Sequence, residues 1–147
     1  MESKKVNDEL TVTGQVAPDD LQQAAQQGFK SVLNLRASDE KDVLADEEQQ
    51  ARAAGLEYTN IPVKKEEISP ELTTRVLAAI DALPKPALIH CASGMRAGAM
   101  AFMHAATRGG MNAQEAMEKA QASGFDCSAE PQLKQFFEQY VDSHTQR

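Results

Sequence analysis

A cysteine and an arginine lie five positions apart in the stretch HCASGMRAG, residues 90–98. Cys91 follows the apolar run 87–89, and a loop containing a glycine leads from it to Arg96. A thiolate is a nucleophile, and a guanidinium offers a planar fork of donors that suits two oxygens of one oxyanion. These residue types at this spacing predict cysteine-based transfer of a phosphoryl group or of sulfur. The alternative is a buried cysteine that only packs as a small hydrophobic residue.

The segments around this stretch alternate between short apolar runs typical of strands and longer patterns typical of helices. Strands are expected within 9–16, 30–36, 57–63 and 84–90, and helices within 17–28, 41–55, 69–83, 95–110, 112–124 and 131–141. This alternation predicts an α/β fold of three layers, with a mostly parallel central sheet and helices on both faces. The chain length predicts one domain over residues 1–147.

In such folds, ligands bind just beyond the carboxyl ends of the strands, and the loop from Cys91 to Arg96 is expected there. Backbone N–H groups and the start of a helix favour negative charge at this place, and Gly94 allows a tight turn. The same field favours the thiolate of Cys91. The predicted anion-binding loop consists of Ala92, Ser93, Gly94, Met95 and Arg96. Cys127 has no such surroundings and is predicted to be structural.

Composition excludes several other classes of function. The formal net charge of −7 argues against nucleic acid or an anionic membrane surface as the main partner. The N-terminal sequence has no apolar core of a signal peptide, and no apolar run is long enough to span a bilayer, so a cytoplasmic protein is expected. Two cysteines 36 positions apart and three scattered histidines indicate neither a disulfide scaffold nor a metal site. No cofactor is expected, and the oligomeric state is not indicated.

The order VLNLR, AGLEYTNIPV, ISPE and LIHCASGMRAG resembles dual-specificity protein phosphatases across roughly residues 10–110. It is more similar still to the small bacterial phosphatase-like domain that occurs alone or fused to beta-lactamase-like hydrolases. That narrower resemblance also includes GQVAPDDLQQAAQQGF toward the N-terminus and AQASGFD toward the C-terminus. The resemblance implies a protein-tyrosine-phosphatase-like fold, with Cys91 as nucleophile, Arg96 as anion clamp and residues 92–95 as the cradle.

The chain also departs from the phosphatases that it resembles. They place five residues between cysteine and arginine, whereas this loop has four, the spacing of single-domain rhodaneses. Ala97 lacks the hydroxyl that follows the arginine in phosphatases. Their general acid is an aspartate after the IPV-like strand, and here only Glu66 and Glu67 offer carboxyls in that segment. The alternative for this segment, KKEE, is a solvated charged turn.

The leading hypothesis is a cysteine-dependent phosphatase-like hydrolase that acts on a small oxyanion or phosphorylated substrate without a metal. The second is a rhodanese-like sulfurtransferase that carries a persulfide on Cys91, and the third is an anion-binding module without turnover. Expectations also follow for two further residues. Arg36 lies either near the same sheet edge or at a surface strand end, and His90 is predicted to be a packed or hydrogen-bonded core side chain.

Overall fold

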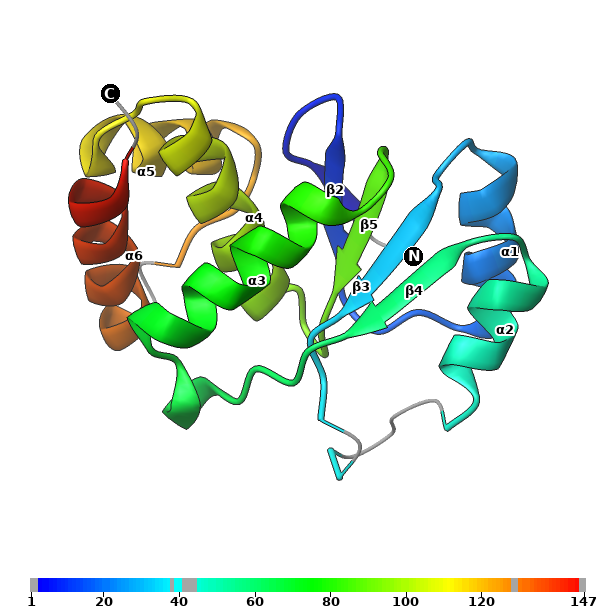
Figure 1. The fold of residues 1–147 in the computed structure, drawn as a ribbon. Coiled ribbons are helices and arrows are strands. Elements are labelled where there is room, and N and C mark those ends of the chain that lie inside the picture. Colours follow the sequence, from blue (N-terminus) through cyan, green and yellow to red (C-terminus); the bar gives the residue numbers. More distant parts are fainter. Residues whose placement is uncertain (1–2, 38, 41–44, 128–129, 146–147) are drawn as a thin grey trace.

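The computed structural model describes residues 3–37, 39–40, 45–127 and 130–145. In these residues a five-stranded sheet lies between helices α1 and α2 on one face and helices α3 to α6 on the other (Figure 1). The strands are β1 (Ser3–Lys5), β2 (Leu10–Thr13), β3 (Ser31–Asn34), β4 (Glu57–Asn60) and β5 (Ala87–His90). The helices are α1 (Pro18–Gln26), α2 (Glu47–Ala53), α3 (Pro70–Ala82), α4 (Met95–Arg108), α5 (Ala113–Ala122) and α6 (Pro131–His144), with a short 3₁₀ turn, η1 (Lys65–Glu67), before α3.

The sheet has the order β1-β2-β5-β3-β4, and only β1 is antiparallel to its neighbour. Strand β5 pairs in parallel with β2 on one side and with β3 on the other. The expected mostly parallel sheet is confirmed. Strand β1 was not predicted, because its residues, Ser3–Lys5, are polar and all exposed, so no apolar alternation marks them.

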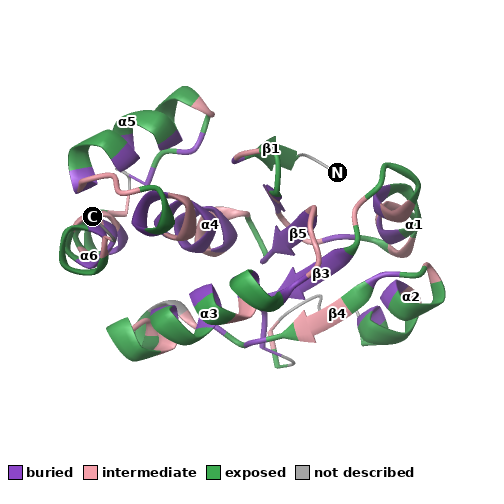
Figure 2. Ribbon diagram, turned by 45° about the horizontal axis from the view of Figure 1, so that its top comes forward, coloured by how far each residue is buried: buried purple, intermediate pink, exposed green. Residues whose placement is uncertain are grey.

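Alternate side chains of the central strands enter two separate cores. Leu88 of β5 packs with α1 and α2 residues, whereas Ile89 joins the larger core on the α3–α6 side. Val32 and Leu33 of β3 divide in the same way, as the period of two in a strand requires. In Figure 2 these strands and most of α4 have the colour of buried residues. Both faces are therefore covered, and the three-layer architecture is confirmed.

Local sequence signals explain several helix boundaries. Ser69 begins α3 by accepting a hydrogen bond from the Leu72 amide at 3.1 Å, and Asn112 and Glu115 form a reciprocal capping box at α5. Helix α2 begins only at Glu47, later than the expected start at residue 41. Residues 41–44 of that expectation lie outside the described residues. Within the described ranges, no helix is long and apolar enough to cross a membrane.

Candidate functional site

Cys91 lies directly after the central strand β5 and is completely buried. Its Sγ accepts hydrogen bonds from the Gly94 amide at 3.1 Å and from the Ala97 amide at 3.4 Å. Gly94 is the residue before α4 and has φ of 91°, a left-handed conformation that side chains other than glycine resist. This turn brings the amides of Gly94 and Ala97 to the sulfur at the N-terminus of α4, a place that suits a negative charge.

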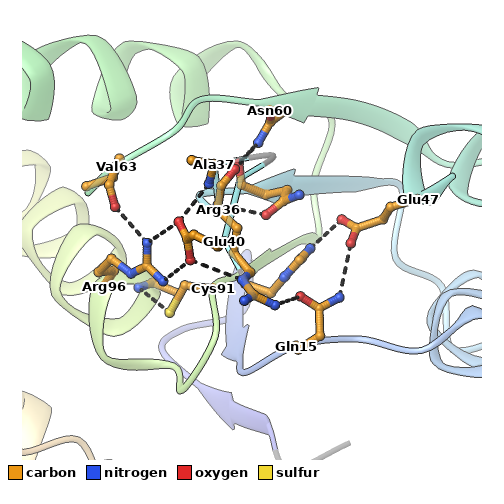
Figure 3. Close-up of polar contacts among 12 residues, drawn as sticks. Gln15, Arg36, Ala37, Glu40, Glu47, Asn60, Val63, Cys91 and Arg96 are labelled. Carbon is orange, nitrogen blue, oxygen red and sulfur yellow. Dashed lines mark hydrogen bonds and ion pairs between the residues drawn. The ribbon is translucent and has the colours of Figure 1, made fainter. Parts of the chain in front are cut away.

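Arg96 lies in the first turn of α4, and its side chain is 16% exposed. Its Nη1 donates to Glu40 Oε2 at 2.9 Å and to the Val63 carbonyl at 2.8 Å, and its Nη2 donates to Glu40 Oε1 at 2.8 Å. The pKa of Arg96 is raised by the Glu40 carboxylate and by the neighbouring Cys91. Figure 3 shows the guanidinium beside both side chains. The thiol and the cation that the sequence singles out are thus neighbours.

Glu40 was not predicted as a site residue. Its carboxylate accepts both bonds from Arg96, one from Arg36 Nε at 3.2 Å and one from the Ala37 amide at 2.7 Å. The hydrogen bond from Arg96 is the main reason that the pKa of Glu40 falls to about 2, with smaller contributions from Ala37 and Arg36 and with burial opposing them. Glu40 is therefore ionised at neutral pH and fixes one edge of the Arg96 guanidinium.

Arg36 lies at the sheet edge near Arg96 and is only 5% exposed, so the surface alternative is wrong. Its Nη1 donates to Gln15 Oε1 at 2.6 Å. The Gln15 amide in turn donates to Glu47 Oε1 at 3.3 Å, and the other oxygen of Glu47 bonds His90 Nε2. His90 is fully buried, which confirms a hydrogen-bonded core histidine. Polar contacts therefore connect the loops after β2 and β3 with the end of β5 (Figure 3).

The two candidate acids of η1 have different surroundings. Glu66 lines a cleft of about 260 Å³ together with Asp39, Glu40, Lys64 and Arg96. Glu67 is exposed and is not among the described residues that line this cleft. The structure thus brings one of the two predicted carboxyl groups to the opening beside Arg96. Lys64, on the same rim, pairs with Asp39 at 3.0 Å, and this contact raises the pKa of Lys64.

A larger cavity, of about 490 Å³, borders the other side of the loop. It is lined by residues 92–95, 12–15 and 124–126, with Ser3 and Lys4 of the first strand. Gly14 permits the close approach of the first two of these segments, because a Cβ there would lie 2.9 Å from the Ala92 carbonyl oxygen. The loop is consequently packed against the segment after β2.

Cys127 is buried, and this burial raises the pKa of its thiol, in keeping with a structural residue. No group of three or more histidine, cysteine, aspartate or glutamate side chains in the described part of the chain is arranged to hold a metal ion.

Residues 2–107 match the family described as the phosphatase-like domain of beta-lactamase hydrolase-like protein. The chain belongs to this family. The phosphatase-like domain is 31% identical over 124 residues to a beta-lactamase hydrolase-like protein of Xylella fastidiosa, covering 82% of this chain and 29% of that protein. The corresponding protein of Agrobacterium fabrum is 28% identical over 152 residues, covering 94% of this chain and 35% of the relative. The chain thus spans about a third of the length of these relatives.

Solved structures have the same fold. A DUF442 protein of Shewanella putrefaciens matches with a TM-score of 0.82 and 24% identity, over 99% of this chain and 91% of that one. TpbA of P. aeruginosa, in complex with pTyr, matches with a TM-score of 0.74 and 16% identity, over 92% and 82%. The catalytic domain of the PP-IP phosphatase SIW14 of S. cerevisiae, in complex with citrate, gives 0.74 and 18%, over 94% and 84%. At these identities the likeness establishes a protein-tyrosine-phosphatase-like α/β fold.

Proposed function

We propose that the phosphatase-like domain is a cysteine-dependent phosphatase acting on a small phosphorylated substrate. The Cys91 thiolate attacks phosphorus, forming an S–P bond while the bond from phosphorus to the leaving oxygen breaks. Glu66 protonates the leaving oxygen. Water then attacks phosphorus, the S–P bond breaks, and inorganic phosphate and the thiolate are released. Membership of the phosphatase-like family supports this reaction class.

The main support for the residue roles is the set of donors that converge near Cys91 Sγ. A guanidinium has five N–H donors, and in the described structure Glu40 and Val63 accept three of those of Arg96. The remaining two, on Nε and Nη2, lie on one edge of the fork and suit two oxygens of one phosphate. The amides at the start of α4 add further donors, and all of them stabilise charge that develops on the equatorial oxygens.

The length of the loop favours a second candidate function. Four residues, 92–95, separate Cys91 from Arg96, the spacing that suggests a sulfurtransferase. In that reaction the Cys91 thiolate attacks the outer sulfur of a donor such as thiosulfate, so that a persulfide forms while the S–S bond of the donor breaks and sulfite leaves. An acceptor thiolate then takes the outer sulfur of the persulfide, and the Cys91 thiolate is released. This reaction has no leaving oxygen to protonate, so Glu66 has no role in it.

One comparison of purified variants tests these roles. Wild type, Cys91→Ser and Arg96→Ala are assayed on p-nitrophenyl phosphate and on thiosulfate with cyanide, with Cys127→Ala as the control for loss of a buried thiol. We expect phosphate release by wild type and by the control, and none above background by Cys91→Ser. Thiocyanate as the sole product would assign the sulfurtransferase. Turnover of neither substrate would contradict both enzymes and leave an anion-binding module.

A further inference from the structure

The opening beside Arg96 is adjacent to a second, apolar cleft. Glu66 lines both, and the second cleft, of about 230 Å³, is otherwise lined by Ile68, Gln132, Leu133 and Phe136. Leu133 is buried in the main core, and Ile68 and Phe136 are half-buried side chains packed against it. A molecule that binds at Arg96 and extends past Glu66 therefore meets an apolar surface formed by Ile68 and by residues of α6.

The charges around the Arg96 opening disfavour a second anionic group on the substrate. The five described residues that line it comprise three carboxylates, Asp39, Glu40 and Glu66, and two cations, Lys64 and Arg96, a net charge of −1. Both cations are already paired, Arg96 with Glu40 and Lys64 with Asp39. A second phosphate on the same substrate would lie among carboxylates without a free cation from this lining, which is electrostatically unfavourable.

We propose that the substrate carries a single oxyanion on an apolar body, which lies across Glu66 in the cleft of Ile68, Leu133 and Phe136. This inference rests on the proposed function, because it takes the position of the oxyanion from it. The two clefts, of about 260 and 230 Å³, together fall in the range of roughly 300–1,000 Å³ typical of small-molecule sites. An aromatic ring or a short acyl chain has the size and the polarity of this body.

Two phosphonates that cannot be hydrolysed separate the apolar body from the anion. Methylphosphonate and benzylphosphonate share the oxyanion, and their affinities are measured by calorimetry and by protection of Cys91 from iodoacetamide. We expect benzylphosphonate to bind wild type at least tenfold more tightly, since burying a ring of this size contributes about that factor or more. Phe136→Ala and Ile68→Ala should each reduce the ratio of the two affinities and leave methylphosphonate binding unchanged.

Phe29→Ala is the matched control, because Phe29 is also a half-buried aromatic side chain but packs in the core of α1 and α2 on the opposite face of the sheet. It should leave the ratio of affinities unchanged. Equal affinity of wild type for the two phosphonates would overturn the inference while leaving the anion site intact. Binding of neither phosphonate would contradict the proposed function, and this inference with it.

Inorganic pyrophosphate tests whether the site accepts only one anionic group. It should bind wild type no more tightly than methylphosphonate does. Asp39→Asn frees the ammonium of Lys64, so this variant should bind pyrophosphate a few-fold more tightly, with a smaller gain for methylphosphonate, as expected for a solvent-exposed ion pair. Wild type that prefers pyrophosphate over both phosphonates would overturn the inference.

Discussion

Glu40 and Arg96 bind each other through two parallel hydrogen bonds, of 2.9 and 2.8 Å, although 56 positions separate them in the chain. Glu40 follows β3, and Arg96 follows β5, the strand beside it in the sheet. The pairing of these strands therefore brings the Glu40 carboxylate to the Nη1 and Nη2 edge of the Arg96 guanidinium.

Glu40→Gln should separate the orientation of Arg96 from its charge. The amide keeps one acceptor but loses the ionic pair, so Arg96 gains rotational freedom near the reacting phosphate. We expect kcat for p-nitrophenyl phosphate to fall about tenfold, since a hydrogen bond between charged groups contributes about 1.5–3 kcal/mol. The inhibition constant of inorganic phosphate should change little, because the cation itself remains.

Glu48→Gln is the control for this experiment, because Glu48 forms an exposed pair with Arg52 on α2. It should leave both constants unchanged. A Glu40→Gln enzyme with wild-type kcat would show that Glu40 does not position Arg96 for the reaction.

The pKa of Glu40 predicts an acid-dependent loss of stability. Folding lowers this pKa from 4.5 to about 2, so the stabilisation is fully present above about pH 4.5 and is lost as the pH falls toward 2. The shift corresponds to at most about 3 kcal/mol, reduced by solvent screening because the side chain is 19% exposed. Urea unfolding at pH 5.5 and pH 3.0 should show a smaller pH-dependent decrease for Glu40→Gln than for wild type. Parallel decreases in the two proteins would rule out this contribution.

Glu66 and Glu67 provide a matched pair for testing the general acid. Glu66→Gln should slow the hydrolysis of phenyl phosphate by about 10²- to 10⁴-fold, because its leaving oxygen needs a proton, and should affect p-nitrophenyl phosphate much less. Glu67→Gln removes the same charge one position along the chain, outside the residues that line the Arg96 cleft, and should change neither rate. Equal effects of Glu66→Gln on both substrates would indicate that Glu66 holds the turn rather than donating a proton.

Arg96 should govern the protection of Cys91 by oxyanions. Vanadate or phosphate should slow alkylation of wild-type Cys91 by iodoacetamide, with the modified residue identified by mass spectrometry. Arg96→Ala should lose most of this protection, since a bidentate, charge-assisted contact has no substitute among the loop amides. Arg52→Ala, which removes an arginine from the surface of α2, should behave as wild type. Undiminished protection in Arg96→Ala would show that the anion binds elsewhere.

The sequence predicted the parts of this molecule that depend on local pattern. The alternation of apolar runs and helical segments was sufficient for the three-layer fold, and the strand-to-helix transition located the loop after Ile89. Glu40 escaped prediction because its role depends on β3 pairing with β5, which no local pattern specifies. The available signal was Glu40 itself, the last residue of NLRASDE, four positions after Arg36. Strand β1 was not predicted because its three residues are exposed and polar, so no apolar side chain marks it in the sequence.

The close contact between Gly98 and Phe125 limits how far helix α4 can turn about its own axis. The Phe125 ring packs so closely there that a Cβ on Gly98 would lie 2.3 Å from its nearest carbon, so turning the helix about its axis would bring larger side chains against the ring. One residue added to the helix would turn everything before it by about 100°. A change from four to five loop residues therefore has to be absorbed entirely between Cys91 and Met95. An insertion mutant that lengthens the loop would have to reshape that turn while the helix keeps its orientation.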